Sequence, residues 1–214
     1  MPSLTTSDII RKIWREPSKT FETILADSDN PYVDSGAMIF VGLAGIGYGL
    51  DRASLRSLGD KIESFPLLVI IASMVGFAGA YIGLDFWSWI FGVTNKWLKG
   101  TGDFERIKTA LAWGAIPFAF AALFWIPELL LFKMENFTDE TPNMDSNVPL
   151  LMTYLGIAFL EFIFVVYCTV IWMKALGRAC NFSAWKALLT TIISALLIII
   201  PIIILVVIFI VGTK

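Results

Sequence analysis

The stretch LLTTIISALLIIIPIIILVVIFIV, residues 188–211, contains no charged side chain. A helix of about 20 apolar residues crosses a bilayer core of roughly 30 Å, so this stretch predicts a membrane-spanning helix. Upstream of it lie four more apolar stretches, separated by short charged segments. The sequence therefore predicts an all-α polytopic membrane helical bundle with five transmembrane helices, near Ser35–Leu50, Phe65–Trp89, Leu111–Phe132, Pro149–Met173 and Leu188–Val211.

The composition agrees with a membrane bundle. Apolar residues make up 57% of the chain and charged residues 16%, whereas a soluble domain carries about 25% charged residues. The first 35 residues contain no apolar core of the kind that signal peptides have, so we expect the first span to remain in the mature protein. We divide the chain into an amphipathic cytoplasmic segment, residues 1–34, and a five-helix transmembrane domain, residues 35–214.

The basic residues predict an orientation, because cytoplasmic loops retain Lys and Arg. Eleven of the sixteen lie before the first span, between the second and third spans, or between the fourth and fifth. We therefore expect the N-terminus in the cytoplasm and the C-terminus outside. A basic cytoplasmic face suits anionic lipid headgroups. Nucleic-acid binding is not indicated, because the basic residues are dispersed at the membrane boundaries.

Apolar residues recur at near-helical spacing on both sides of Pro17, with basic residues between them. This pattern is typical of a helix that lies in the membrane interface, and docking of a cytosolic partner is the alternative. The aromatic run at residues 86–91 is typical of an interfacial belt at the end of the second span. We assign interfacial anchoring to Trp14, Phe21, Trp87 and Trp89.

Small residues four apart occur on the first two spans. They let helix backbones approach closely, which is how membrane helices associate without a hydrophobic driving force. Packing of these two spans against each other is the favoured interpretation, and a homodimer seam is the alternative. We assign helix packing to Gly45, Gly49, Gly76, Gly79 and Gly83.

Three carboxylates are candidates for an ion or proton site. Glu161 lies near the middle of the fourth span, where an acid costs about 2.5–3.5 kcal/mol on insertion scales. Asp85 is expected at the cytoplasmic edge of the second span, and Glu128 near the external boundary of the third. Each could instead be structural, hydrogen-bonded to a neighbouring helix.

Prolines interrupt two of the spans. Pro117 and Pro127 lie in the third span and Pro201 in the fifth, and each is expected to kink its helix. Broken helices can build transporter sites, although single kinks are common in membrane helices. The fifth span has no polar side chain from Ile198 to Val211, which favours a lipid-facing helix.

Several absences bear on chemistry. The chain contains no histidine and no nucleotide-binding motif, which excludes His-based triads and His metal ligands. Cys168 and Cys180 are expected to be free thiols. We expect no catalytic residue, no metal site and no cofactor, and we infer that the protein is not an enzyme.

Three stretches resemble bacterial Yip-domain proteins. The run IWREPSKTF, residues 13–21, is similar to the family's Trp-x-x-Pro-x-x-x-Phe opening. The run WLKGTGDFER, residues 97–106, resembles its Gly-x-Gly-x-Phe turn and leads into AWGAIP, residues 112–117. The run LGRACNFSAWKA, residues 176–187, matches its loop between the fourth and fifth spans. The resemblance extends over nearly the whole chain.

The resemblance implies an α-helical Yip-domain fold. Eukaryotic relatives are Golgi and endoplasmic-reticulum proteins linked to Rab GTPases and membrane traffic. This chain lacks their long cytosolic region and its Asp-Leu-Tyr-Gly-Pro motif, and the short form is similar to bacterial members. The sequence thus favours a non-enzymatic scaffold in a bacterial cytoplasmic membrane. Its expected partners are the lipid bilayer, a second copy of the chain or other membrane proteins. A proton or cation transporter that uses Glu161 is the alternative.

Overall fold

A computed structural model describes residues 5–26 and 31–212, and these residues form helices and connecting turns only. The four longest helices are α3 (Pro31–Ser54), α4 (Phe65–Trp97), α9 (Val148–Ala179) and α10 (Ala184–Gly212). Shorter helices are α1 (Thr6–Lys12), α2 (Pro17–Ala26), α5 (Phe104–Gly114), α6 (Ile116–Ala121), η2 (Ala122–Phe124) and α7 (Trp125–Leu131). The loops at one end of the bundle contain η1 (Leu58–Asp60), η3 (Lys133–Phe137) and α8 (Pro142–Ser146).

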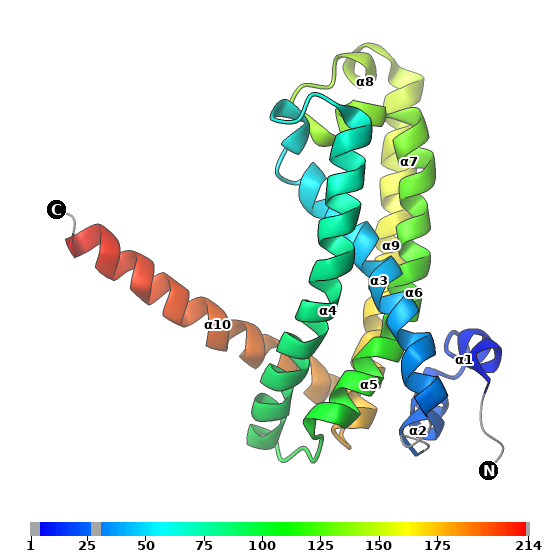
Figure 1. The fold of residues 1–214 in the computed structure, drawn as a ribbon, viewed down its shortest axis with the longest axis vertical. Coiled ribbons are helices and arrows are strands. Elements are labelled where there is room, and N and C mark those ends of the chain that lie inside the picture. The colour runs from blue at the N-terminus through cyan, green and yellow to red at the C-terminus, as the bar shows by residue number, and fades with distance from the viewer. Residues whose placement is uncertain (1–4, 27–30, 213–214) are drawn as a thin grey trace.

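Four helical segments in the described part of the chain are long and apolar enough to cross a membrane: Phe65–Trp97, Phe104–Leu131, Val148–Ala179 and Ala184–Ile210. The protein is thus a multi-pass membrane protein. The predicted first span corresponds to α3, which is not among the four. In the sequence Asp34 and Asp51 bracket only sixteen residues of this helix, fewer than the roughly 20 that a bilayer core requires. Even so, α3 packs along α4 and α6 within the bundle (Figure 1).

The segment Phe104–Leu131 is divided into the consecutive helices α5, α6, η2 and α7. Pro117 lies in the first turn of α6, where its missing N–H leaves no backbone hydrogen bond unmade. Pro127 occupies the first turn of α7 in the same way. Pro201 differs, because α10 continues through it as one helix.

The N-terminal helices pack against the bundle. Ile9, Ile13 and Phe21 are at most 1% exposed and belong to the largest core cluster, together with residues of α5 and α9. The Trp14 ring stacks on Tyr167 of α9 at 6.2 Å, and the Tyr167 hydroxyl donates a hydrogen bond to the Trp14 carbonyl oxygen. We expected Trp14 and Phe21 to be interfacial anchors. In the structure both side chains contact protein: Phe21 of α2 packs in the core cluster with residues of α5 and α9, and Trp14 also contacts Phe164 of α9.

Candidate functional site

Helices α3 and α4 cross at three glycines. A Cβ atom added to Gly76 would lie 2.7 Å from the Cα of Gly49 and also against the Gly45 carbonyl oxygen. One added to Gly45 would lie 2.5 Å from the Gly76 carbonyl oxygen. These three glycines therefore allow the two backbones to touch. Gly79 and Gly83, which we expected in the same contact, face open space: a Cβ at either position meets nothing within 4 Å.

Two residues beyond Gly49, α3 contributes Asp51 to a cluster of acids. The indole Nε1–H of Trp125 in α7 donates a hydrogen bond to the Asp51 carboxylate at 2.9 Å. Trp125 is 6% exposed and stacks on Phe137 with ring centroids 5.5 Å apart, which fixes its orientation. The next turn of α7 places Glu128, 7% exposed, on the inner side of the same helix.

Glu161 of α9 completes the cluster. The side chain of Glu128 lies within electrostatic range of both Glu161 and Asp51, and Tyr154 lies within range of both glutamates. Glu128 is buried, Glu161 is half-buried and Asp51 is exposed, so the acids extend from the bundle interior to its surface. We call Asp51, Glu128 and Glu161 the acidic cluster.

Asp85 lies elsewhere. Its carboxylate pairs with the Lys108 ammonium of α5 at 2.7 Å. Along α4 it is thirteen residues, or about 20 Å, from Ala72, which lies beside the α3–α4 crossing. Of the three predicted carboxylates, Glu128 and Glu161 thus lie near each other in the structure. The third acid near them is Asp51 and not Asp85. The sequence offered no signal for Asp51, because it follows the predicted first span directly and resembles an ordinary flanking charge.

The acidic cluster holds three carboxylates and has one nearby cation, Arg52, which is adjacent to Asp51 in the chain. Like charges repel strongly where water is scarce, so such a cluster favours uptake of a proton. Among the described residues no three acidic, Cys or His side chains converge closely enough to hold a metal ion. The acids do lie within electrostatic range of one another, which suits reversible proton binding.

The last long helix, α10, has two distinct parts. Its first eleven residues pack on α4 and α9, with Ala187, Thr190 and Ser194 fully buried. The Ser194 and Thr94 hydroxyls share a buried hydrogen bond of 2.7 Å between α10 and α4. Residues 199–208, which we call the α10 arm, are all apolar and all exposed. The helix slants away from the bundle along this arm (Figure 1).

The α4–α5 loop, which contains Gly100 and Gly102, packs against the α9–α10 loop. The Thr101 N–H donates to the Cys180 carbonyl oxygen at 3.1 Å, and the Asn181 amide donates to the Thr101 hydroxyl at 2.6 Å. A Cβ on Gly102 would lie 2.9 Å from the Cys180 sulfur. The glycine turn between α4 and α5 is therefore shaped to receive the α9–α10 loop.

The remaining predicted residues have separate environments. Trp89 is 61% exposed on the outer face of α4, whereas Trp87 stacks on Phe91 at 5.5 Å.

Both cysteines are buried free thiols. Burial raises the pKa of the Cys180 thiol to about 12, so this side chain is neutral and unreactive at physiological pH.

Comparison with protein families matches the chain to the Yip1 domain over residues 11–208. Comparison with curated proteins and with solved structures gives no significant match. The matched region includes all three sequence motifs, the acidic cluster and the whole α10 arm. The chain therefore belongs to the Yip1 domain family.

Proposed function

We propose that this protein is a non-enzymatic membrane scaffold that associates with a second copy of itself through the α10 arm. The α10 arm is the observation that carries the proposal. It is apolar on every side and exposed over residues 199–208, while the first part of the same helix is anchored by the Thr94–Ser194 hydrogen bond. Such a helix can reach a neighbouring molecule without disturbing its own bundle.

In this proposal the arm of the second copy lies on the outer face of α9. Phe159, Leu160 and Phe162 are each at least 58% exposed there. On the same helix a Cβ at Gly156 would meet nothing within 4 Å, which leaves room for close approach of another helix. Exchange of identical arms between two copies about a two-fold axis makes two equal contacts.

The proposed setting is a bacterial cytoplasmic membrane with α3 as a fifth span. The eleven basic residues of the predicted cytoplasmic side belong to α1, α2, the ends of α4 and α9, and the starts of α5 and α10, with the turns between them. These segments lie at one end of the bundle (Figure 1). That end would face the cytoplasm under the positive-inside rule, and an odd number of spans would put the C-terminus outside.

A photocrosslinking amino acid at Leu205 tests the contact in intact membranes. We expect Leu205 to capture a second copy and the crosslinked peptide to come from α9, since the arm would lie on that helix. The matched control is the same amino acid at Ile82 of α4, which is 73% exposed but outside the proposed contact. Capture of lipid alone at Leu205, or equal dimer yields at both positions, would contradict the proposal.

The acidic cluster favours a second candidate function, transport of protons or monovalent cations. The supporting observation is that Asp51, Glu128 and Glu161 lie within electrostatic range of one another, with Arg52 as the nearby cation. Carboxylates at membrane depth that lack balancing charges commonly bind the transported ion.

Flux measurements in proteoliposomes test this candidate. Wild-type protein should conduct protons or monovalent cations, and Glu161→Gln and Glu128→Gln should each lower the rate at least tenfold, as expected for loss of an essential proton carrier. Asp85→Asn is the control, because Asp85 pairs with Lys108 outside the cluster and should leave flux unchanged. Absence of wild-type flux would remove transport from consideration, and flux that survives both Gln substitutions would show that the acidic cluster does not carry it.

A further inference from the structure

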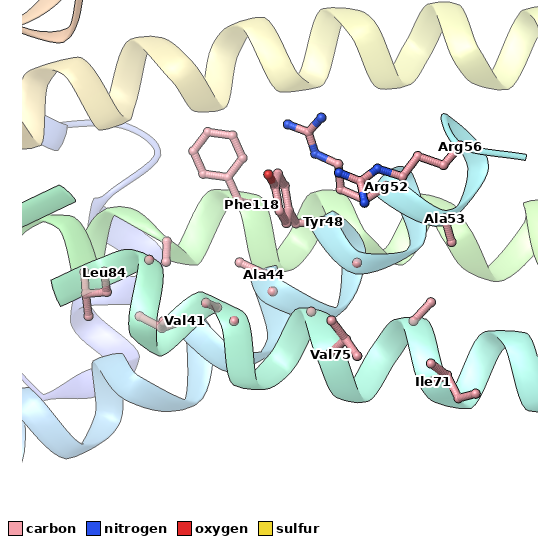
Figure 2. Close-up of a pocket in the computed structure, with 18 of the residues that line it drawn as sticks. Val41, Ala44, Tyr48, Arg52, Ala53, Arg56, Ile71, Val75, Leu84 and Phe118 are labelled. Atoms are coloured by element: carbon pink, nitrogen blue, oxygen red, sulfur yellow. The ribbon is translucent and has the colours of Figure 1, made fainter. Parts of the chain in front are cut away.

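A second feature of the bundle lies along the α3–α4 crossing. It is a groove of about 890 Å³ bounded by α3, α4 and α6 (Figure 2). Its walls are mainly apolar and include Val41, Ala44, Ile71, Val75, Leu84 and Phe118.

The groove is elongated along α4. Along α4 its lining runs from Leu68 to Trp87, a rise of about 28 Å at 1.5 Å per residue. Gly79 and Gly83 both line it, and the open space that a Cβ would meet at these positions belongs to the groove. One leaflet is about half of the roughly 30 Å thickness of a bilayer core, so the groove is long enough for an extended acyl chain.

The end of the groove nearest the α3–α4 loop is cationic. Arg52 and Arg56 line this end, and their side chains extend along it near Tyr48 (Figure 2). The Arg52 guanidinium lies over the Tyr48 ring, 4.8 Å from its centroid. The ion pairs found in the described part of the chain involve neither arginine. Asp51, the acid next to Arg52, is instead hydrogen-bonded to Trp125.

We propose that this groove binds one anionic phospholipid, with an acyl chain along α4 and the phosphate at Arg52 and Arg56. Guanidinium groups recognise phosphate through paired N–H donors, and an apolar channel recognises the chain. A membrane lipid has its phosphate at the membrane surface and its acyl chains in the core. The arginines at the end of α3 match the first position, and the groove along the spanning helix α4 matches the second. An uncharged or zwitterionic lipid would use the channel but would not gain the net attraction of the two cations.

Native mass spectrometry of the intact protein in mild detergent tests this proposal with phosphatidylglycerol and phosphatidylcholine as probes. Wild-type protein should bind phosphatidylglycerol more tightly. Arg52→Gln and Arg56→Gln should each reduce that affinity about fivefold, and the double variant about 30-fold, from the typical strength of one basic residue near anionic headgroups. Lys61→Gln is the matched control, since Lys61 is an exposed cation on the same loop but does not line the groove.

A second variant tests the apolar part of the groove independently of the two arginines. Gly79→Leu places a side chain in the groove, where its Cβ meets no other atom, so the fold should be kept while phosphatidylglycerol binding is lost. Glycerol phosphate, which has the charge but no acyl chain, should not compete with the lipid at equal concentration. Equal affinity for the two lipids, unchanged binding in the Gly79→Leu variant, or full competition by glycerol phosphate would overturn the proposal.

Discussion

Replacing Gly76 by alanine is expected to destabilise the bundle by about 1–3 kcal/mol, the usual range for overpacking a tight contact. The new Cβ would lie 2.7 Å from the Gly49 Cα and against the Gly45 carbonyl oxygen. These neighbours are backbone atoms, so a side-chain rotation cannot relieve the overlap and α3 must move away from α4. Thermal unfolding of the purified protein in one fixed detergent measures the effect.

Gly79→Ala is the matched control for that experiment. The position is one turn further along α4, and a Cβ there meets nothing within 4 Å. Alanine favours helix over glycine by up to about 1 kcal/mol, so this variant should be as stable as wild type or slightly more stable. Equal destabilisation by the two substitutions would show that the α3–α4 crossing does not depend on Gly76.

Phe21→Ala should have a larger effect, a loss of about 3–5 kcal/mol in the free energy of unfolding, as is typical for a buried Phe. Phe21 is 0% exposed and packs in the same core cluster as Trp113 of α5 and Ile171 of α9. Its removal leaves a cavity where α2 joins the bundle. Limited proteolysis together with thermal unfolding would report both the loss of stability and the release of the N-terminal helices.

Phe86→Ala is the control for this second substitution. Phe86 is the same residue type in α4 but is 45% exposed and lies outside the proposed contact between copies, so its truncation removes less buried protein contact. The stability difference between the two variants measures how far the N-terminal helices belong to the fold. If both variants unfold at the wild-type temperature, α2 is a peripheral segment, contrary to its burial in the structure.

The membrane-spanning helices were largely predictable from the sequence, because an uninterrupted run of about 20 apolar residues is typical of a membrane span. The second span was predicted to begin at Phe65, where α4 begins, and the fourth and fifth lie within α9 and α10. Their ends were underestimated, since α4 continues through the polar residues Thr94 and Asn95, both 0% exposed. The side-chain NH2 of Asn95 donates hydrogen bonds to the Phe91 and Gly102 carbonyl oxygens.

The N-terminal segment shows what the sequence could not decide. Its spacing indicated apolar helical faces on both sides of Pro17, and the structure contains α1 and α2 there. An apolar helix face, however, looks the same in sequence whether lipid or protein covers it. The covering residues, such as Trp14's partner Tyr167, are more than 150 positions away in the chain.

Prediction of the acidic cluster from the sequence was limited in the same way. Glu161 and Glu128 were noticed because acids are rare in apolar stretches, which is a local signal. Asp51 lacked that signal, and its link to Trp125 spans 74 positions. Gly76, by contrast, was identified beside Gly79 and Gly83, but only the crossing geometry shows which of the three glycines touches α3.

The most direct test of the proposed scaffold is to count the copies of the chain in native lipid discs by single-molecule photobleaching, for wild type and for Gly156→Phe. A Phe side chain at this open position leaves the monomer intact but occupies the surface on which the arm of a second copy would pack. We expect two bleaching steps for wild type and one for the variant. One step for both proteins, or two for both, would contradict self-association through the α10 arm.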